Sequence, residues 1–439
     1  MTGKPLGRRT FLKAALAAGG TSALSACIER EGQVDVPTGD PSSLPERQFA
    51  WNQSLPTGPH GNVKLPNHQL ILLLDYGDDG PPSNRDRERV EQAFRTLERA
   101  YQWGTGDEFS PETTTGLLFF AGYAPRYFDR FDRDLPGGVS PTRPEAVIDE
   151  LGEKAGVDEA DAVVVLTSDE VQVLLAAEQA LRGNFDSLND VPVDAALTDV
   201  FDIVDRRTGF LGVGRPASEL AADVPEESPT AMGYRSGFKD NQATESRVAI
   251  HLGPFADGTI LQLSRLAFDL DSWYEYDESE RVKRMFSPEH TPEEVGDIGE
   301  NLGGQSRISR ETVERTDRDA ETHGVVGHTQ KVASARDDSF EPTILRRSEG
   351  VSTDLSTPAM NFISLQRYVE EFLEVRRAMD CPAGADESAG SSGCPIHGEP
   401  VSEENDGIRG FISTLTRGTY LVPPRSLRAL PTPDPETET

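Results

Sequence analysis

Apolar runs of strand length and segments of helical periodicity alternate through the first half of the chain. Four such runs lie at residues 69–75, 116–123, 161–167 and 200–204. Residues 86–103 and 170–181 instead carry apolar side chains at helical spacing. Short runs bounded by polar turns are typical of buried strands, and a helical stripe is typical of an amphipathic helix. The resulting order, strand–helix–strand twice, predicts a ferredoxin-like unit.

The second half repeats this order of elements without repeating the sequence. Strands are expected at residues 258–267, 343–346, 359–365 and 418–424, with an extended stretch beginning at 247–250 and a turn with a short strand at 324–331. Helices are expected at residues 270–286 and 369–379. The pattern predicts an α+β fold of two ferredoxin-like halves that resembles a dimeric α+β barrel, with antiparallel sheets packed together and helices outside.

The halves are expected at residues 66–215 and 230–428, followed by an acidic, proline-containing tail at residues 429–439. Residues 28–65 are rich in Pro, Gly, Ser and charge and have no apolar period, so we expect a flexible linker there.

The first 27 residues carry a targeting pattern. The pair Arg8-Arg9 stands in a cationic start, residues 14–26 are weakly apolar, and small residues precede Cys27. The apolar stretch is about half as long as a membrane-spanning helix. The segment resembles a twin-arginine lipoprotein signal, with Cys27 as the site of acylation. This resemblance implies export by the twin-arginine pathway and lipid attachment to the outer face of the cytoplasmic membrane.

Charge narrows the range of partners. The 439 residues include 75 acidic and 43 basic side chains, which gives a formal net charge of −32. Such a surface repels nucleic acid, so no nucleic-acid partner is expected. Acidic residues spread along the whole chain favour a halophilic protein over an ordinary acidic one. The composition also allows a homo-oligomer.

Two further cysteines, Cys381 and Cys394, flank a Gly/Ser-rich stretch that is followed by His397. In an exported protein they could form a disulfide or remain free thiols. With His397 they could also form part of a metal site, although the sequence offers no evident fourth ligand.

Three short segments carry candidate chemistry: the glycine-rich residues 233–242, which include Asp240; residues 327–331, which include His328; and residues 344–348, which include Arg346. Taken singly, each has a structural explanation: a turn or N-cap aspartate, a surface histidine and an ion-paired arginine. Their order and spacing together resemble the dye-decolorizing peroxidases, a family of haem enzymes built from two ferredoxin-like halves. Asn241 stands where the aspartate motif of that family has a second glycine.

The resemblance covers roughly residues 66–428 and implies a haem b site. It implies that His328 binds the iron, that Asp240 transfers a proton and that Arg346 stabilises the departing oxygen of peroxide. Three residues are implied as further cofactor contacts: Arg347, Phe238 and Phe362. His323 is the main rival to His328 as ligand, but it lacks the motif and the spacing to Arg346.

Three functions follow from the resemblance. The first is a cell-surface haem peroxidase that reduces hydrogen peroxide and oxidises an unknown donor. The second is a haem- or iron-handling lipoprotein with little turnover. The third is a haem-free binding protein on the same fold. The presence of Asp240, His328 and Arg346 favours the first function over the third.

Overall fold

The computed structural model describes residues 36–104, 112–211, 230–235, 238–304, 306–348, 350–352, 357–380 and 405–435. Cys27, Cys381, Cys394 and His397 lie outside these residues. In the part that is described, no helix is long and apolar enough to cross a membrane.

The N-terminal half is a four-stranded antiparallel unit with the strand order β7-β1-β4-β2. Its main strands are β1 (His68–Tyr76), β2 (Leu118–Tyr123), β4 (Ala162–Ser168) and β7 (Phe201–Phe210). Its helices are α3 (Asn84–Ala100), α4 (Pro125–Phe128), α5 (Pro144–Leu151) and α6 (Val171–Leu181). The short strands are β3 (Gly156–Val157), β5 (Ser187–Leu188) and β6 (Val191–Pro192). A capping box between Ser83 and Asp86 fixes the start of α3.

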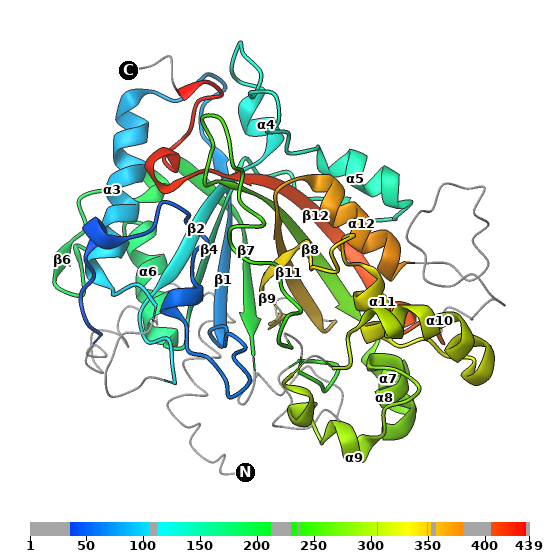
Figure 1. Ribbon diagram of the computed structural model, residues 1–439. Coiled ribbons are helices and arrows are strands. Elements are labelled where there is room, and N and C mark those ends of the chain that lie inside the picture. The colour runs from blue at the N-terminus through cyan, green and yellow to red at the C-terminus, as the bar shows by residue number, and fades with distance from the viewer. Residues whose placement is uncertain are drawn as a thin grey trace.

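The C-terminal half has the equivalent strand order, β12-β8-β11-β9. Its strands are β8 (Thr259–Phe268), β9 (Leu345–Ser348), β10 (Val351–Ser352), β11 (Ala359–Gln366) and β12 (Ile412–Val422). Its helices are α7 (Leu270–Glu275), α8 (Glu278–Met285), α9 (Pro292–Val295), α10 (Arg310–His323), α11 (His328–Ser334) and α12 (Val369–Met379). Helices α3 and α6 lie on one side of the strands, and α10, α11 and α12 lie on the other (Figure 1).

The two sheets join at both edges into one closed structure. At one edge, β10 pairs with both β7 and β11. At the other edge, β2 and β12 share the register pair Tyr123↔Leu421. The side chain of Gln48 supports this second junction, because it accepts a bond from Ala121 N at 3.0 Å and donates to Ala121 O at 3.2 Å and Pro423 O at 2.8 Å.

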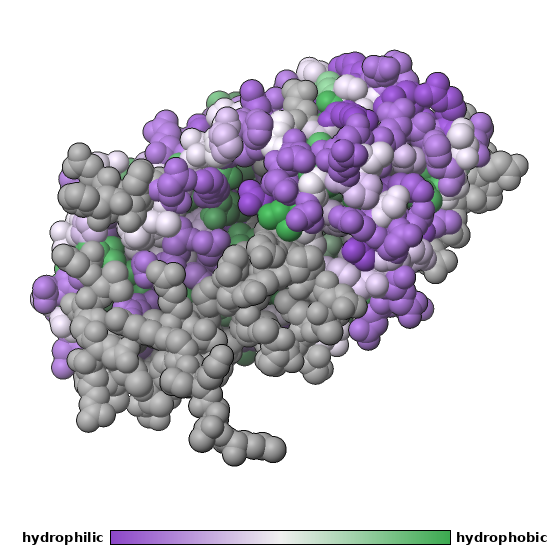
Figure 2. All heavy atoms as spheres, turned by 90° about the horizontal axis from the view of Figure 1, so that it is seen from below, coloured by the Kyte–Doolittle hydropathy of each residue, from purple (hydrophilic) through white to green (hydrophobic). Residues whose placement is uncertain are grey.

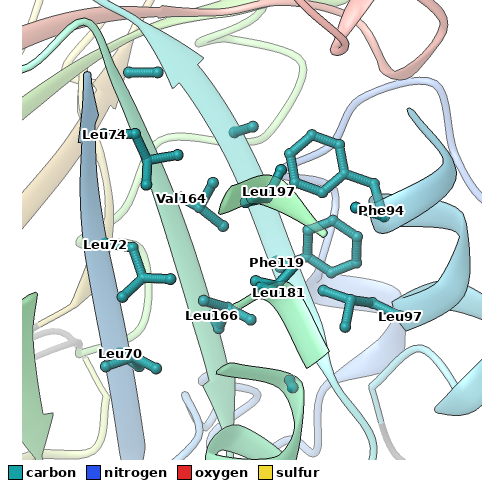
Figure 3. Packing of buried hydrophobic residues seen from close by; sticks show 14 of the residues in the cluster. Leu70, Leu72, Leu74, Phe94, Leu97, Phe119, Val164, Leu166, Leu181 and Leu197 are labelled. Atoms are coloured by element: carbon teal, nitrogen blue, oxygen red, sulfur yellow. The ribbon is translucent and has the colours of Figure 1, made fainter. Parts of the chain in front are cut away.

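Strand alternation divides the core into layers. Leu70, Leu72 and Leu74 of β1 pack under α3 and α6, where Figure 3 shows them with Phe94 and Leu97 of α3. The intervening Ile71 and Leu73 belong to a separate core between the two sheets. Inner residues of the C-terminal half complete that second core, among them Leu261, Leu263, Ile363 and Leu365. The predicted α+β fold, with two ferredoxin-like halves packed sheet to sheet, is therefore confirmed.

The expected flexible linker is wrong for the described residues 36–65. Phe49 and Trp51 have 0% exposure and pack in the core between the sheets, because their large aromatic surfaces gain by leaving water. The beginning of the expected tail also packs on the N-terminal half, because Leu430 is fully buried in its core.

Three local expectations in the C-terminal half also differ from the structure. The helix expected at residues 270–286 is divided into α7 and α8, because Asp277 caps the start of α8. Residues 324–331 contain the start of α11 and a single bridge from Val326 to Asp406, with no strand. Residues 247–250 form turns and bends instead of extended chain. Among the coloured residues in Figure 2, hydrophilic ones predominate, and apolar ones are visible only in small areas.

Candidate functional site

A cavity of about 230 Å³ lies on the helix-facing side of the C-terminal sheet. That volume is on the order of fifteen times the space needed for one water molecule, so the cavity is large enough for an organic ligand. Alternate residues of β8 line it, namely Ser264, Leu266 and Phe268, and Phe362 does so from β11. Helices α11 and α12, with Ala335 directly after α11, contribute further lining that includes these apolar residues: Val332, Ala335, Phe372, Val375 and Met379.

His328 lines this cavity as the first residue of α11, a helix that the sequence pattern did not predict. Gly327 precedes it, and a side chain there would collide with the carbonyl of Phe286 at the end of α8. Thr329 donates to the carbonyl of Met285 at 3.3 Å. Gln330 accepts from the N–H of Gly327 at 2.8 Å and donates to Asp319 at 3.0 Å. These contacts fix the backbone that carries the imidazole.

The imidazole of His328 is held neutral. Burial lowers its pKa to about 3, and three cavity cations add to the effect: Arg346, Lys331 and Arg376. A neutral imidazole keeps a lone pair for a metal or a hydrogen bond. His323, the rival in sequence, is exposed at the end of α10 and is not a lining residue.

Arg346 and Arg347 point to opposite faces of β9. Arg346 lines the cavity. Arg347 is 3% exposed and faces the core between the sheets, where it pairs with Glu245 at 2.5 Å and lies 5.3 Å from the ring centre of Trp51. Alternation along a strand requires this separation. The structure therefore places Arg347, an expected cofactor contact, outside the lining of this cavity.

Asp240 is also outside the cavity lining, and Asn241 takes its place. Asp240 is exposed at a φ of 59°, and its carbonyl accepts a bond from Arg336. The chain then turns inward, so that Asn241 lines the cavity. This correction follows from the left-handed backbone at Asp240, a conformation that aspartate tolerates better than most residues.

The two phenylalanines expected at the cofactor are separated. Phe362 lines the cavity. Phe238 is 8% exposed and packs instead in the cluster beside the cavity, 6.0 Å from the ring of Phe286. Of the expected site residues, the cavity thus brings together His328, Arg346 and Phe362.

An ion network that includes Lys331 of α11 lines part of the cavity, and sequence reasoning missed it. Lys331 pairs with Asp406 at 2.5 Å. Asp380 binds Arg376 at 2.6 Å and Arg409 at 2.8 Å. The four cationic members of the network line the cavity: Lys331, Arg376, Arg409 and Arg417.

Glu153 joins this network from the N-terminal half. It accepts from Arg417 Nη2 at 2.5 Å, from Thr414 at 3.1 Å and from Arg376 at 3.2 Å. Burial opposes the ionisation of Glu153, but the bonds from Arg417 outweigh it and hold the pKa below its ordinary value. The only sequence signal for these residues was Lys331, one helical turn after His328 on the same face of α11.

Within the described ranges, no group of three or more His, Cys, Asp or Glu side chains could hold a metal ion.

The closed pair of ferredoxin-like halves is the fold of the dye-decolorizing peroxidases. The encapsulated DyP-type peroxidase from Mycobacterium smegmatis matches at 14% identity with a TM-score of 0.52, covering 86% of this chain and 99% of that one. The dye-decolorizing protein from V. cholerae matches at 14% identity and a TM-score of 0.49, covering 86% of this chain and 98% of that one. A variant of DypB from Rhodococcus jostii RHA1, solved in complex with heme, matches at 14% identity and a TM-score of 0.47, covering 83% of this chain and 96% of that one.

Residues 66–424 match a family of unknown function, DUF7405, and the chain belongs to that family. No curated protein matches the chain in sequence. At 14% identity, the similarity to the solved structures shows the fold alone.

Proposed function

We propose that the cavity binds haem b through His328 and that the protein reduces peroxide with electrons from an external donor. The observation that carries the proposal is that His328 and Arg346 line the same largely apolar cavity. A neutral imidazole is a suitable axial ligand for haem iron, and an apolar wall suits the macrocycle.

The residues present fit this cofactor. Burial keeps the imidazole of His328 unprotonated, as iron binding requires. Phe362 and Leu266 offer apolar surface, and the arginines of the ion network can pair with carboxylates of a bound porphyrin. The bound haem would supply a centre that binds peroxide and accepts its oxidising equivalents. The guanidinium of Arg346 would stabilise the negative charge that develops on oxygen as the O–O bond breaks.

The visible spectrum of the protein, produced with haem available, tests the proposal. We expect a Soret band that His328→Ala removes. His323→Ala is the matched control, because this histidine is exposed and outside the lining, and its Soret band should persist. A correctly folded wild-type protein without a Soret band would refute the haem site.

A second candidate is a haem- or iron-handling protein with little turnover. The exposed position of Asp240 favours it, because the carboxylate expected to transfer a proton is not in the cavity lining. Arg346→Ala separates the two functions. If the protein is a peroxidase, this variant should keep its Soret band and lose roughly 10²–10³-fold in its rate with peroxide. If wild type and Arg346→Ala instead react with peroxide at the same slow rate, the haem- or iron-handling function would be favoured.

We further propose that the protein is exported by the twin-arginine pathway and anchored by a lipid on Cys27. The support is the order of Arg8-Arg9, a short apolar stretch and a cysteine preceded by small residues. Cys27→Ser should move the protein from the membrane fraction to the soluble exported fraction. Replacing Arg8-Arg9 by two lysines should instead retain it in the cytoplasm.

A further inference from the structure

Among the described residues, no carboxylate lines the cavity beside Arg346. Residues 241–243 run beside the start of β9, with Ala243 N bonded to Ile344 O at 3.0 Å and Arg346 N bonded to the side chain of Gln242 at 2.8 Å. Asn241 therefore enters the cavity from the segment that flanks Arg346. An amide donates and accepts hydrogen bonds but does not exchange protons near neutral pH.

The carboxylate of Asp406 is engaged elsewhere in the cavity. It is the only carboxylate among the described lining residues. It pairs with Lys331, and the next residue, Gly407, packs against the backbone of His328. Asp406 therefore belongs to the His328 side of the cavity.

Apart from His328, the proposed ligand of the haem iron, the other described ionisable residues of the lining do not act as bases. Tyr234 stays protonated, because burial raises its pKa. The others are cations: Arg235, Lys331, Arg336, Arg376, Arg409 and Arg417. Such a lining stabilises an anion and removes no proton from a neutral ligand.

We propose that this cavity takes peroxide as the hydroperoxide anion, with Arg346 pairing with its charge and Asn241 donating a hydrogen bond to it. The inference rests on the proposed haem site and concerns the substrate form. The proton of hydrogen peroxide is released to solvent before binding. Two one-electron organic donors then complete the reduction, HOO⁻ + 2 e⁻ + 3 H⁺ → 2 H₂O, with the protons taken from solvent.

Ligand binding tests this assignment without turnover. Cyanide, whose conjugate acid is also weak, binds as an anion and shifts the Soret band. Its association rate, and the rate of the spectral change with peroxide, should rise about tenfold per pH unit between pH 6 and pH 8, because the anionic fraction rises by that factor below the ligand pKa. A flat profile in wild-type protein with an intact Soret band would overturn this inference and leave the haem site standing. Absence of the Soret band would instead refute the proposed function.

Asn241→Asp supplies the missing base. At pH 6 it should raise both rates on the order of 10²-fold and flatten the pH profile. Asn301→Asp is the control, since it adds the same charge at an exposed position and should leave the steep profile unchanged. If Asn241→Asp does not fold, Asn241→Ala provides the second test: the profile should stay steep while cyanide dissociates faster. A lower rate in Asp240→Asn than in wild type would overturn the proposal, because it would identify Asp240 as the base.

Discussion

Glu153→Gln should destabilise the protein far more than Glu150→Gln, although both carboxylates lie at the end of α5. Glu153 is largely shielded from solvent and pairs with the buried Arg417, at 12% and 1% side-chain exposure. Glu150 pairs with Arg377 at the surface, at 54% and 38%. The two substitutions change the same atoms in neighbouring positions, so their difference isolates the effect of burial.

The expected magnitude follows from what the substitution leaves behind. Glutamine cannot neutralise Arg417, which is packed against Phe372 and also bonds Ser264 at 2.6 Å. Removing one partner of a buried ion pair costs about 3–5 kcal/mol, whereas an exposed pair contributes about 0–1 kcal/mol. For a chain of this length, the larger loss corresponds to a decrease in melting temperature of roughly 5 °C.

Thermal and urea unfolding, followed by circular dichroism, measure both variants against wild type. The depressed pKa of Glu153 also predicts how this stability difference depends on pH. The stabilisation by Glu153 is present at neutral pH and is lost as pH falls through the pKa of the folded state. The gap between wild type and Glu153→Gln should therefore narrow in acid. A Glu153→Gln variant as stable as Glu150→Gln at pH 7 would refute the view that burial makes the pair of Glu153 and Arg417 strongly stabilising.

Three further predictions concern the junction, the candidate ligand and acid stability. Gln48→Leu leaves three buried main-chain groups without partners and should cost about 3 kcal/mol or more in unfolding free energy, while the exposed Gln53→Leu should be nearly neutral. Gly327→Ala forces a methyl group against a carbonyl at the end of α8 and should abolish the Soret band although the imidazole is retained. Burial lowers the pKa of His290 to about 4, so the unfolded chain takes up its proton first as pH falls from 7 to 5 and stability decreases; His290→Gln should make that decrease in urea-unfolding free energy shallower.

Most of the fold could be predicted because its strands are marked by local patterns. The apolar runs of β1 and β4 are buried on both faces, as their continuous Leu and Val residues indicate. Helix α10 was missed because its buried positions, Thr312, Thr316, Asp319 and Ala320, include few apolar side chains. The core role of Phe49 and Trp51 was missed because the polar segment around them has no periodicity.

The candidate site was harder to predict, because its arrangement depends on backbone direction and distant contacts. Arg346 and Arg347 could have been assigned from Leu345, whose apolar side chain marks the face that Arg347 shares. The outward turn at Asp240 is a single left-handed residue with no periodic signal. The pairing of Glu153 with Arg417 joins positions 264 residues apart, and no local pattern reports such a contact.

The shared core between the two sheets has a consequence for synthesis of the chain on the ribosome. The inner face of the N-terminal sheet, with Ile71, Leu73 and Phe120, is covered by strands that end with β12. At ordinary translation speeds, the roughly 200 residues between β7 and the end of β12 take on the order of 10–40 s to appear. During that interval the first sheet carries an uncovered apolar surface, so the nascent chain should depend on chaperones until its second half has emerged.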